Sequence, residues 1–192
     1  MDNRRASQSY QPSASDVAKY LLKKKGTLTG FQLQKLLYYC QAWSLTVEDK
    51  PLFSEEIRAY EHGPVVPSVS MQHMGRVRVY PRDINGNAAV LSEADKTFID
   101  VVLSAYEGLT GDQLAWLTHH EEPWIKCYNQ RTSVSSSAVI PQEVMREYYA
   151  KLLTMSDEDQ LKHHVPQFDH PKRLYVSSSD YDWLQKYLSD EE

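Results

Sequence analysis

The side chains best suited to metal binding or acid–base chemistry cluster at residues 119–122, where the sequence reads His-His-Glu-Glu. Imidazole and carboxylate groups are ligands that zinc prefers. Zinc motifs on a helix, however, place two histidines four residues apart, whereas adjacent residues point about 100° apart around the axis. The spacing therefore favours solvation or a local hydrogen bond at a helix end. His163 and His164 have the same adjacent spacing, and His170 adds no ligand pattern, so we expect no metal site.

A thiol and an imidazole offer a second chemistry, with Cys40 as the nucleophile and His62 as the base. Cys40 lies on the apolar stripe of a predicted helix, which favours a buried structural thiol. His62 precedes Gly63-Pro64, where it can anchor the turn by a hydrogen bond, and a binding role is the alternative. The glycines form no nucleophile elbow, phosphate-binding loop or dinucleotide fingerprint. We therefore predict a protein that is not an enzyme and has no cofactor, and an enzyme using a His/Glu or Cys/His site is the alternative.

The length and composition indicate a cytoplasmic protein. A chain of 192 residues suits one domain of about 150 residues with tails. The two cysteines, Cys40 and Cys127, are far apart and form no paired motif, which is typical of reduced thiols in the cytosol. The chain has no apolar run of about 18 residues, and its first residues do not resemble an export signal, so we predict neither a membrane span nor secretion.

The charges are distributed unevenly along this acidic chain, whose net charge is -5. Residues 1–35 carry seven basic and two acidic side chains, whereas residues 155–192 carry nine acidic and four basic ones. A basic front and an acidic tail suggest partner recognition at one end or both, and a solvated surface is the alternative. One short basic run in an acidic protein is weak support for nucleic-acid binding.

Helix-start signals divide most of the chain into helices. A first helix is expected from Ser13 or Ser15 to the residue before Gly26. Thr29 and Gln32 have the spacing of a capping box and start a second helix, whose apolar and aromatic stripe makes it central to the core. Further helices are expected to begin near Ser92, Thr110, Pro123, Pro141 and Ser156.

A small β-hairpin is expected between the second helix and the helix that begins near Ser92. Residues 76–80 alternate with period two, Asn85-Gly86 is a strong turn dipeptide, and residues 88–91 could form the returning strand. The predicted fold is therefore mainly α, a compact multi-helix domain with a small β-hairpin element and a C-terminal amphipathic helix.

The chain divides into three predicted parts. Residues 1–12 form a disordered arm, residues 13–154 form the domain, and residues 155–192 form an acidic extension with an amphipathic helix. The apolar side of that last helix is a candidate surface for binding a partner protein. Its residues are Tyr181, Trp183, Leu184, Tyr187 and Leu188.

Two segments of the domain resemble a known family. One reads Leu-Gln-Lys-Leu-Leu-Tyr-Tyr over residues 33–39 and continues with Gln-Ala-Trp over residues 41–43; the other is His-Gly-Pro-Val-Val-Pro over residues 62–67. In this order they resemble the domain of SocA-like and GepA-like phage-associated proteins, the Panacea antitoxin domain. The signature residues, with structural or binding roles, are Lys35, Tyr38, Gln41, Trp43, His62, Gly63, Pro64, Val65, Val66 and Pro67.

The resemblance implies a cytoplasmic antitoxin of a toxin–antitoxin system that neutralises a cognate protein toxin, encoded nearby, by direct protein–protein binding. Self-association is also open. Two other functions are alternatives: a DNA-binding autoregulator of its own operon, which would use the basic front, and an adaptor that delivers the toxin to a protease.

Overall fold

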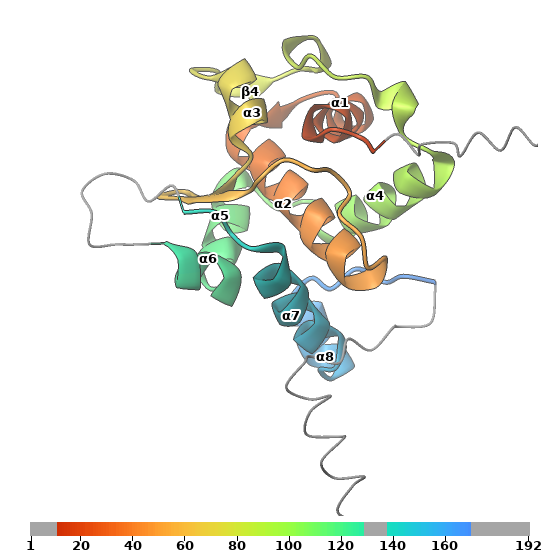
Figure 1. Ribbon diagram of the computed structural model, residues 1–192, viewed down its shortest axis with the longest axis vertical. Coiled ribbons are helices and arrows are strands. Elements are labelled where there is room, and N and C mark those ends of the chain that lie inside the picture. Colours follow the sequence, from red (N-terminus) through yellow and green to blue (C-terminus); the bar gives the residue numbers. More distant parts are fainter. Residues whose placement is uncertain (1–10, 129–137, 170–192) are drawn as a thin grey trace, which may run out of the picture.

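The computed structural model describes residues 11–128 and 138–169 (Figure 1). Within these ranges the helices are α1 (Ala14–Lys25), α2 (Gly30–Val47), α3 (Pro67–Ser70), α4 (Glu93–Ala105), α5 (Gly111–His119), α6 (Glu122–Cys127), α7 (Gln142–Leu153) and α8 (Asp157–Lys162), with 3₁₀ turns η1 (Met71–His73), η2 (Pro81–Asp83) and η3 (Ala88–Val90). The strands are β1 (Leu28–Thr29), β2 (Arg58–Tyr60), β3 (Gly63–Val65) and β4 (Arg78–Val79). The predicted mainly α fold with a small hairpin is confirmed. The predicted helix over residues 181–188 and most of the predicted arm lie outside the described residues.

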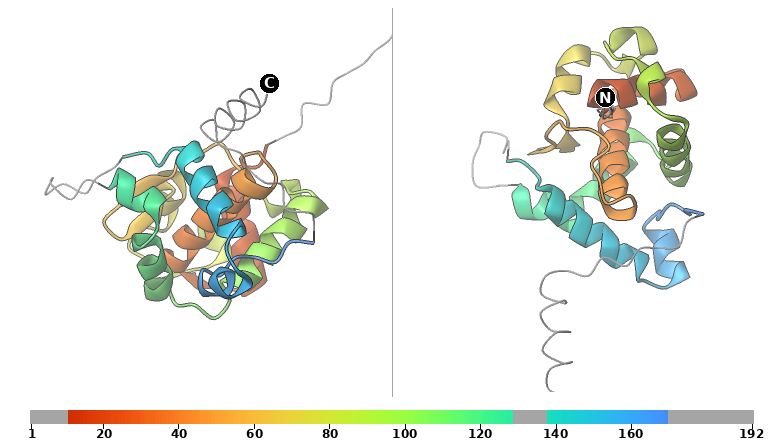
Figure 2. Two further views of the ribbon diagram at one scale, coloured as in Figure 1. Left: turned by 90° about the horizontal axis from the view of Figure 1, so that it is seen from below. Right: turned by 45° about the vertical axis from the view of Figure 1, so that its right-hand side comes forward.

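Helix α2 runs through the middle of the molecule, and α1, α4, α5 and α7 all pack against it (Figure 2). Every side chain from Leu33 to Thr46 is buried, including the polar ones. A helix that is buried all round must pair each polar side chain with a partner inside the protein. Those pairings determine how the rest of the fold is attached to α2.

Four helices begin at the capping residues that the sequence predicts. Reciprocal capping boxes join Ser13 with Asp16 at α1 and Thr29 with Gln32 at α2. The same arrangement begins α4 at Ser92 and α5 at Thr110. Each box pairs backbone amides that would otherwise lack a partner at the helix start, which explains why these boundaries can be read from four-residue patterns.

The predicted location of the hairpin is wrong. Strand β4 pairs with β1, just before α2, and Ala88–Val90 forms the 3₁₀ turn η3 instead of a strand. The reason is that Asn85-Gly86 packs on α1: Gly86 lies against the Ser15 carbonyl with no room for a Cβ, and the Asn87 N–H donates to Asp16 Oδ1 over 2.6 Å. Asn85-Gly86 therefore allows the chain to pack closely against α1 and does not form the turn of a hairpin.

The hairpin of the structure is formed by β2 and β3, which turn at Glu61-His62. Residues 138–140 run along the other edge of β2, where the Ala59 N–H donates to the Ala138 carbonyl and the Ile140 N–H donates to the Ile57 carbonyl, each over 2.8 Å. The hairpin is thus held by the residues that lead into α7.

The end of the described chain also packs on the domain. Gln160 Nε2 of α8 donates to the Leu153 carbonyl over 3.0 Å, and the Phe168 ring stacks on Phe98 of α4 at 5.5 Å. The division of the chain at residue 154 stays a prediction. Within the described ranges, no helix combines the length and apolar character that a membrane span needs.

Candidate functional site

Two buried glutamines of α2 hold the extended segments that follow it. Gln41 Oε1 accepts from the Leu52 N–H at 2.9 Å and the Phe53 N–H at 3.1 Å, while its Nε2 donates to the Phe53 carbonyl at 2.9 Å. Gln34 Oε1 accepts from the Val66 N–H at 2.8 Å, and its Nε2 lies 3.0 Å from His73 Nε2. Each side chain replaces the water that these backbone groups would otherwise need.

Lys35 fixes strand β3 in the same way but carries an ionisable group. Its side chain is fully buried, and Nζ donates to the Pro64 carbonyl over 3.0 Å. Burial lowers the pKa of Lys35 to about 7, because the charged ammonium is poorly solvated there. Near neutral pH this amine is therefore divided between its charged and neutral forms.

Gly63 brings three elements together at this point. Its φ of +96° lies in the region that favours glycine, and a Cβ there would lie 2.6 Å from Lys35 Cε and 2.7 Å from Thr118 Oγ1. Gly63 belongs to β3, Lys35 to α2 and Thr118 to α5. The glycine of the signature is thus explained by the close contact among the hairpin and two helices.

The remaining signature residues divide into buried and exposed ones. Trp43 Nε1 donates to the Tyr106 hydroxyl over 3.0 Å, and Val66 and Pro67 begin α3. The Tyr38 side chain is fully buried, with the Glu121 carboxylate and the Tyr149 hydroxyl near its own hydroxyl. Val65 is half-buried and His62 is exposed.

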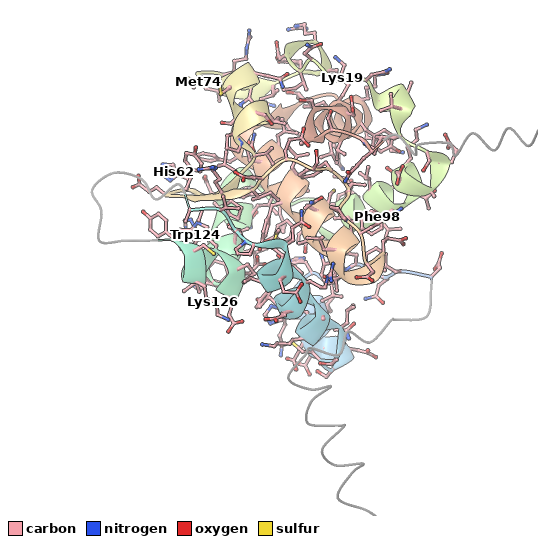
Figure 3. All side chains as sticks on the ribbon, viewed as in Figure 1. Lys19, His62, Met74, Phe98, Trp124 and Lys126 are labelled. Atoms are coloured by element: carbon pink, nitrogen blue, oxygen red, sulfur yellow. The ribbon has the colours of Figure 1, made fainter. Side chains whose placement is uncertain are left out.

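His62 occupies the tip of the hairpin, where its ring lies 5.4 Å from that of Phe31 (Figure 3). The backbone of the signature turn is instead held from inside by Gln34 and Lys35. This position leaves the His62 imidazole on the surface, available to a partner.

The side chains of the His-His-Glu-Glu segment have separate neighbours inside the protein. His120 makes the local hydrogen bond expected of a helix end, with Nδ1 2.7 Å from the Trp116 carbonyl. The His119 ring is tilted against that of Trp124, with the ring centroids 4.2 Å apart. In the part of the chain that the structure describes, no three His, Cys, Asp or Glu side chains gather so that they could hold a metal ion. Cys40, the other candidate, is fully buried, and burial raises the pKa of its thiol, which disfavours the nucleophilic thiolate.

Glu121 is the residue that the sequence pattern misses, because it is buried rather than solvated. Oε1 accepts from the Tyr39 hydroxyl at 3.1 Å and Oε2 from the Tyr149 hydroxyl at 2.8 Å. Burial raises the pKa of Glu121 to about 7, although the tyrosine hydrogen bonds oppose the shift. The two hydroxyls come from α2 and α7, far away in the sequence, so no local spacing predicts the cluster.

We expect Glu121→Gln to flatten the dependence of stability on pH between pH 4.5 and 7. An acid whose pKa is raised in the folded state stabilises the fold below its unfolded pKa, and this contribution is lost as the pH rises through the folded value. A shift from 4.5 to about 7 corresponds to roughly 3 kcal/mol in the free energy of unfolding. Urea denaturation at several pH values measures it. Glu122→Gln, at the half-exposed neighbouring position, is the control and should keep the wild-type pH profile.

The comparison with protein families identifies this scaffold. Residues 33–125 match the family model described as "Antitoxin SocA-like, Panacea domain". No curated protein and no solved structure matches the chain. The matched range starts in α2, includes the β2–β3 hairpin and α5, and ends in α6. The segment that carries the buried Lys35 and Gly63 junction therefore matches the SocA-like, Panacea domain family, over 93 of the 192 residues of the chain.

Proposed function

We propose that this protein is the antitoxin of a toxin–antitoxin pair and neutralises its toxin by direct protein–protein binding. The observation that carries the proposal is the family match over residues 33–125. The gene for such a toxin is expected beside the gene for this protein, and both proteins are expected to act in the cytoplasm.

The enclosure of the titratable side chains supports a role as a binding protein rather than an enzyme. Lys35, Cys40 and Glu121 have shifted pKa values, and shifted groups can mark catalytic sites. All three side chains are buried and pack inside the domain, where a substrate cannot reach them. Their hydrogen bonds attach the hairpin and α7 to α2, which is a structural role.

The experiment that tests the proposal is co-expression with the protein encoded by the neighbouring gene, followed by purification of the pair. Rescue of growth together with a stable complex is expected. Rescue without a complex would contradict direct binding and favour toxin degradation, which the half-life of the toxin with and without this protein would measure. Absence of toxicity and of binding, with both proteins expressed, would contradict the function.

Residues 181–188 are proposed to contribute to the contact with the toxin, and they lie outside the described residues. We expect Trp183→Ala to weaken toxin binding at least tenfold, because a buried tryptophan is often an interface anchor. Calorimetric titration measures the affinity, and Leu161→Ala, which truncates an exposed side chain of α8, is the control. Affinity of the Trp183 variant within twofold of the wild type would remove the tail from the interface.

A further inference from the structure

Helix α5 exposes a tryptophan within the family-matched part of the chain. The Trp116 side chain is 60% exposed, and its ring is tilted against that of His120 with the ring centroids 4.1 Å apart. Phe31, at the start of α2, is 43% exposed and packs beside His62 of the hairpin tip. Large aromatic side chains are usually buried, and several exposed ones close together indicate a binding surface.

Two contacts place α5 beside Phe31 and the hairpin, and the His119 side chain on the flank of α5 has Glu61, His62 and His120 as its electrostatic neighbours. The first turn of α5 lies against α2 at Phe31, since a Cβ on Gly111 would be 2.9 Å from that of Phe31. The last turn of α5 lies against the hairpin, through Thr118 and Gly63. On α5 itself, Asp112, Trp116 and His120 are spaced by four residues and share the exposed side of the helix. We name Phe31, Glu61, His62, Asp112, Trp116 and His120 the α5–hairpin face.

Hydrogen bonds from α6 and α2 hold the hairpin behind this face. Trp124 Nε1 of α6 donates to the Tyr60 carbonyl of the hairpin over 2.9 Å, and the centroid of the Trp124 ring lies 4.2 Å from that of His119 of α5. Trp124 is labelled in Figure 3. Lys35 holds the hairpin from the opposite side through the Pro64 carbonyl. A surface that is already ordered loses little conformational entropy when a partner binds.

The charges around the face select the chemistry of the partner. Glu61 and Asp112 are exposed, and neither forms an ion pair with another described residue. An aromatic face flanked by carboxylates attracts a lysine or arginine, by cation–π attraction to the ring and by opposite charge at its edge. We propose that the α5–hairpin face docks a basic segment of the toxin, with a cationic side chain over Trp116. The assignment rests on the proposed function and names a surface of the domain that contributes to it in addition to residues 181–188.

A second group of exposed apolar side chains provides a comparison with the α5–hairpin face. Met71, Met74 and Val77 are exposed and lie in the segment between α3 and β4. Their charged neighbours are Arg76 and Arg78, both exposed. This surface would repel a basic segment, so substitutions there provide matched controls of similar exposure.

The test measures the affinity of the full-length protein for the co-expressed neighbouring gene product, purified separately. We expect Trp116→Ala and Glu61→Lys each to weaken binding at least tenfold, with Val77→Ala and Glu48→Lys as controls that stay within twofold of the wild type. The loss for Glu61→Lys should shrink as salt is raised, because salt screens exposed charges. A Lys→Glu or Arg→Glu substitution in the toxin that restores binding to Glu61→Lys would identify the docked segment.

The outcomes separate the surface from the function. A wild-type complex whose affinity is unchanged by Trp116→Ala and Glu61→Lys would overturn the docking assignment and leave the antitoxin function standing. Burial of the same face in a homodimer, detected by sedimentation and abolished by Trp116→Ala, would also overturn it. Lack of any wild-type complex would overturn the assignment and the direct-binding function together. Melting curves of the variants, expected to match the wild type because the substituted side chains are exposed, exclude misfolding as the cause.

Discussion

Gly63→Ala lowers the free energy of unfolding by roughly 3 kcal/mol, which combines backbone strain with crowding in a packed site. At a φ of +96° an alanine is strained wherever it stands. Its Cβ would also lie 2.6 Å from Lys35 Cε and 2.7 Å from Thr118 Oγ1, both closer than such atoms can approach. Lys35 is fully enclosed, so it can yield only by withdrawing its amine from the Pro64 carbonyl. Urea denaturation at fixed pH measures the change.

Gly75→Ala separates the effect of backbone strain from that of crowding by Lys35 and Thr118. Gly75 also has a positive φ, of +77°, but a Cβ there would meet nothing within 4 Å. We expect it to lose only the strain, about 1–2 kcal/mol. Equal losses at Gly63 and Gly75 would show that the contact with Lys35 and Thr118 can relax, and would contradict the three-element junction described here.

Features of this fold that depend on residues close together in the sequence are predictable, whereas those that depend on distant residues are not. The starts of α1 and α2 are correctly predicted because Ser13 with Asp16 and Thr29 with Gln32 satisfy backbone groups within four residues. The central position of α2 is predictable from its continuous apolar and aromatic pattern. The hairpin was placed at the wrong segment because Asn85-Gly86 has the same local appearance in a turn and in a contact with α1.

The buried ionisable groups could not be predicted from spacing. Glu121 is stabilised by Tyr39 and Tyr149, which are 82 and 28 residues away in the sequence. Lys35 looks like a surface residue in a helix pattern, and the partner to which the structure shows its amine donating is the Pro64 carbonyl, 29 residues away. The family resemblance did mark Lys35 as a signature residue, but only the packed structure explains it as the group that fixes the hairpin backbone.

Lys35→Met should remove a rise in stability between pH 7 and 10.5. The pKa of Lys35 is lowered from 10.5 to about 7 in the folded protein, so the unfolded chain binds more protons over this interval. A base with a lowered pKa contributes stability that is complete above its unfolded pKa and is lost as the pH falls through its folded value. The shift corresponds to roughly 5 kcal/mol between the two ends of the interval. Denaturation of wild type and variant across the interval measures it.

The stability of Lys35→Met relative to the wild type should therefore differ between pH 10 and pH values below 7. Near pH 10 methionine is the poorer residue, because it cannot donate to the Pro64 carbonyl, a loss of about 1–3 kcal/mol. Below pH 7 methionine gains relative to lysine, because the wild type then buries an ammonium without a carboxylate partner among the described residues. Lys126→Met, at an exposed position on α6, should leave the profile unchanged. A parallel profile for Lys35→Met and wild type would mean that the Lys35 ammonium is solvated on protonation.

The contribution of Glu121 to the free energy of unfolding changes with pH in the opposite direction to that of Lys35, and over the adjoining pH range. The two buried groups together therefore give the domain a dependence of stability on pH that neither gives alone. Glu121 removes stability as the pH rises from 4.5 to about 7, whereas Lys35 restores it from about 7 to 10.5. The combined contribution is smallest near pH 7, where the carboxylate and the ammonium are each half-formed. The double variant Glu121→Gln with Lys35→Met should lose this minimum, since it removes both titrations while leaving the exposed α5–hairpin face unchanged. If the double variant still binds the toxin as the wild type does, the two groups act on the fold and not on the interface.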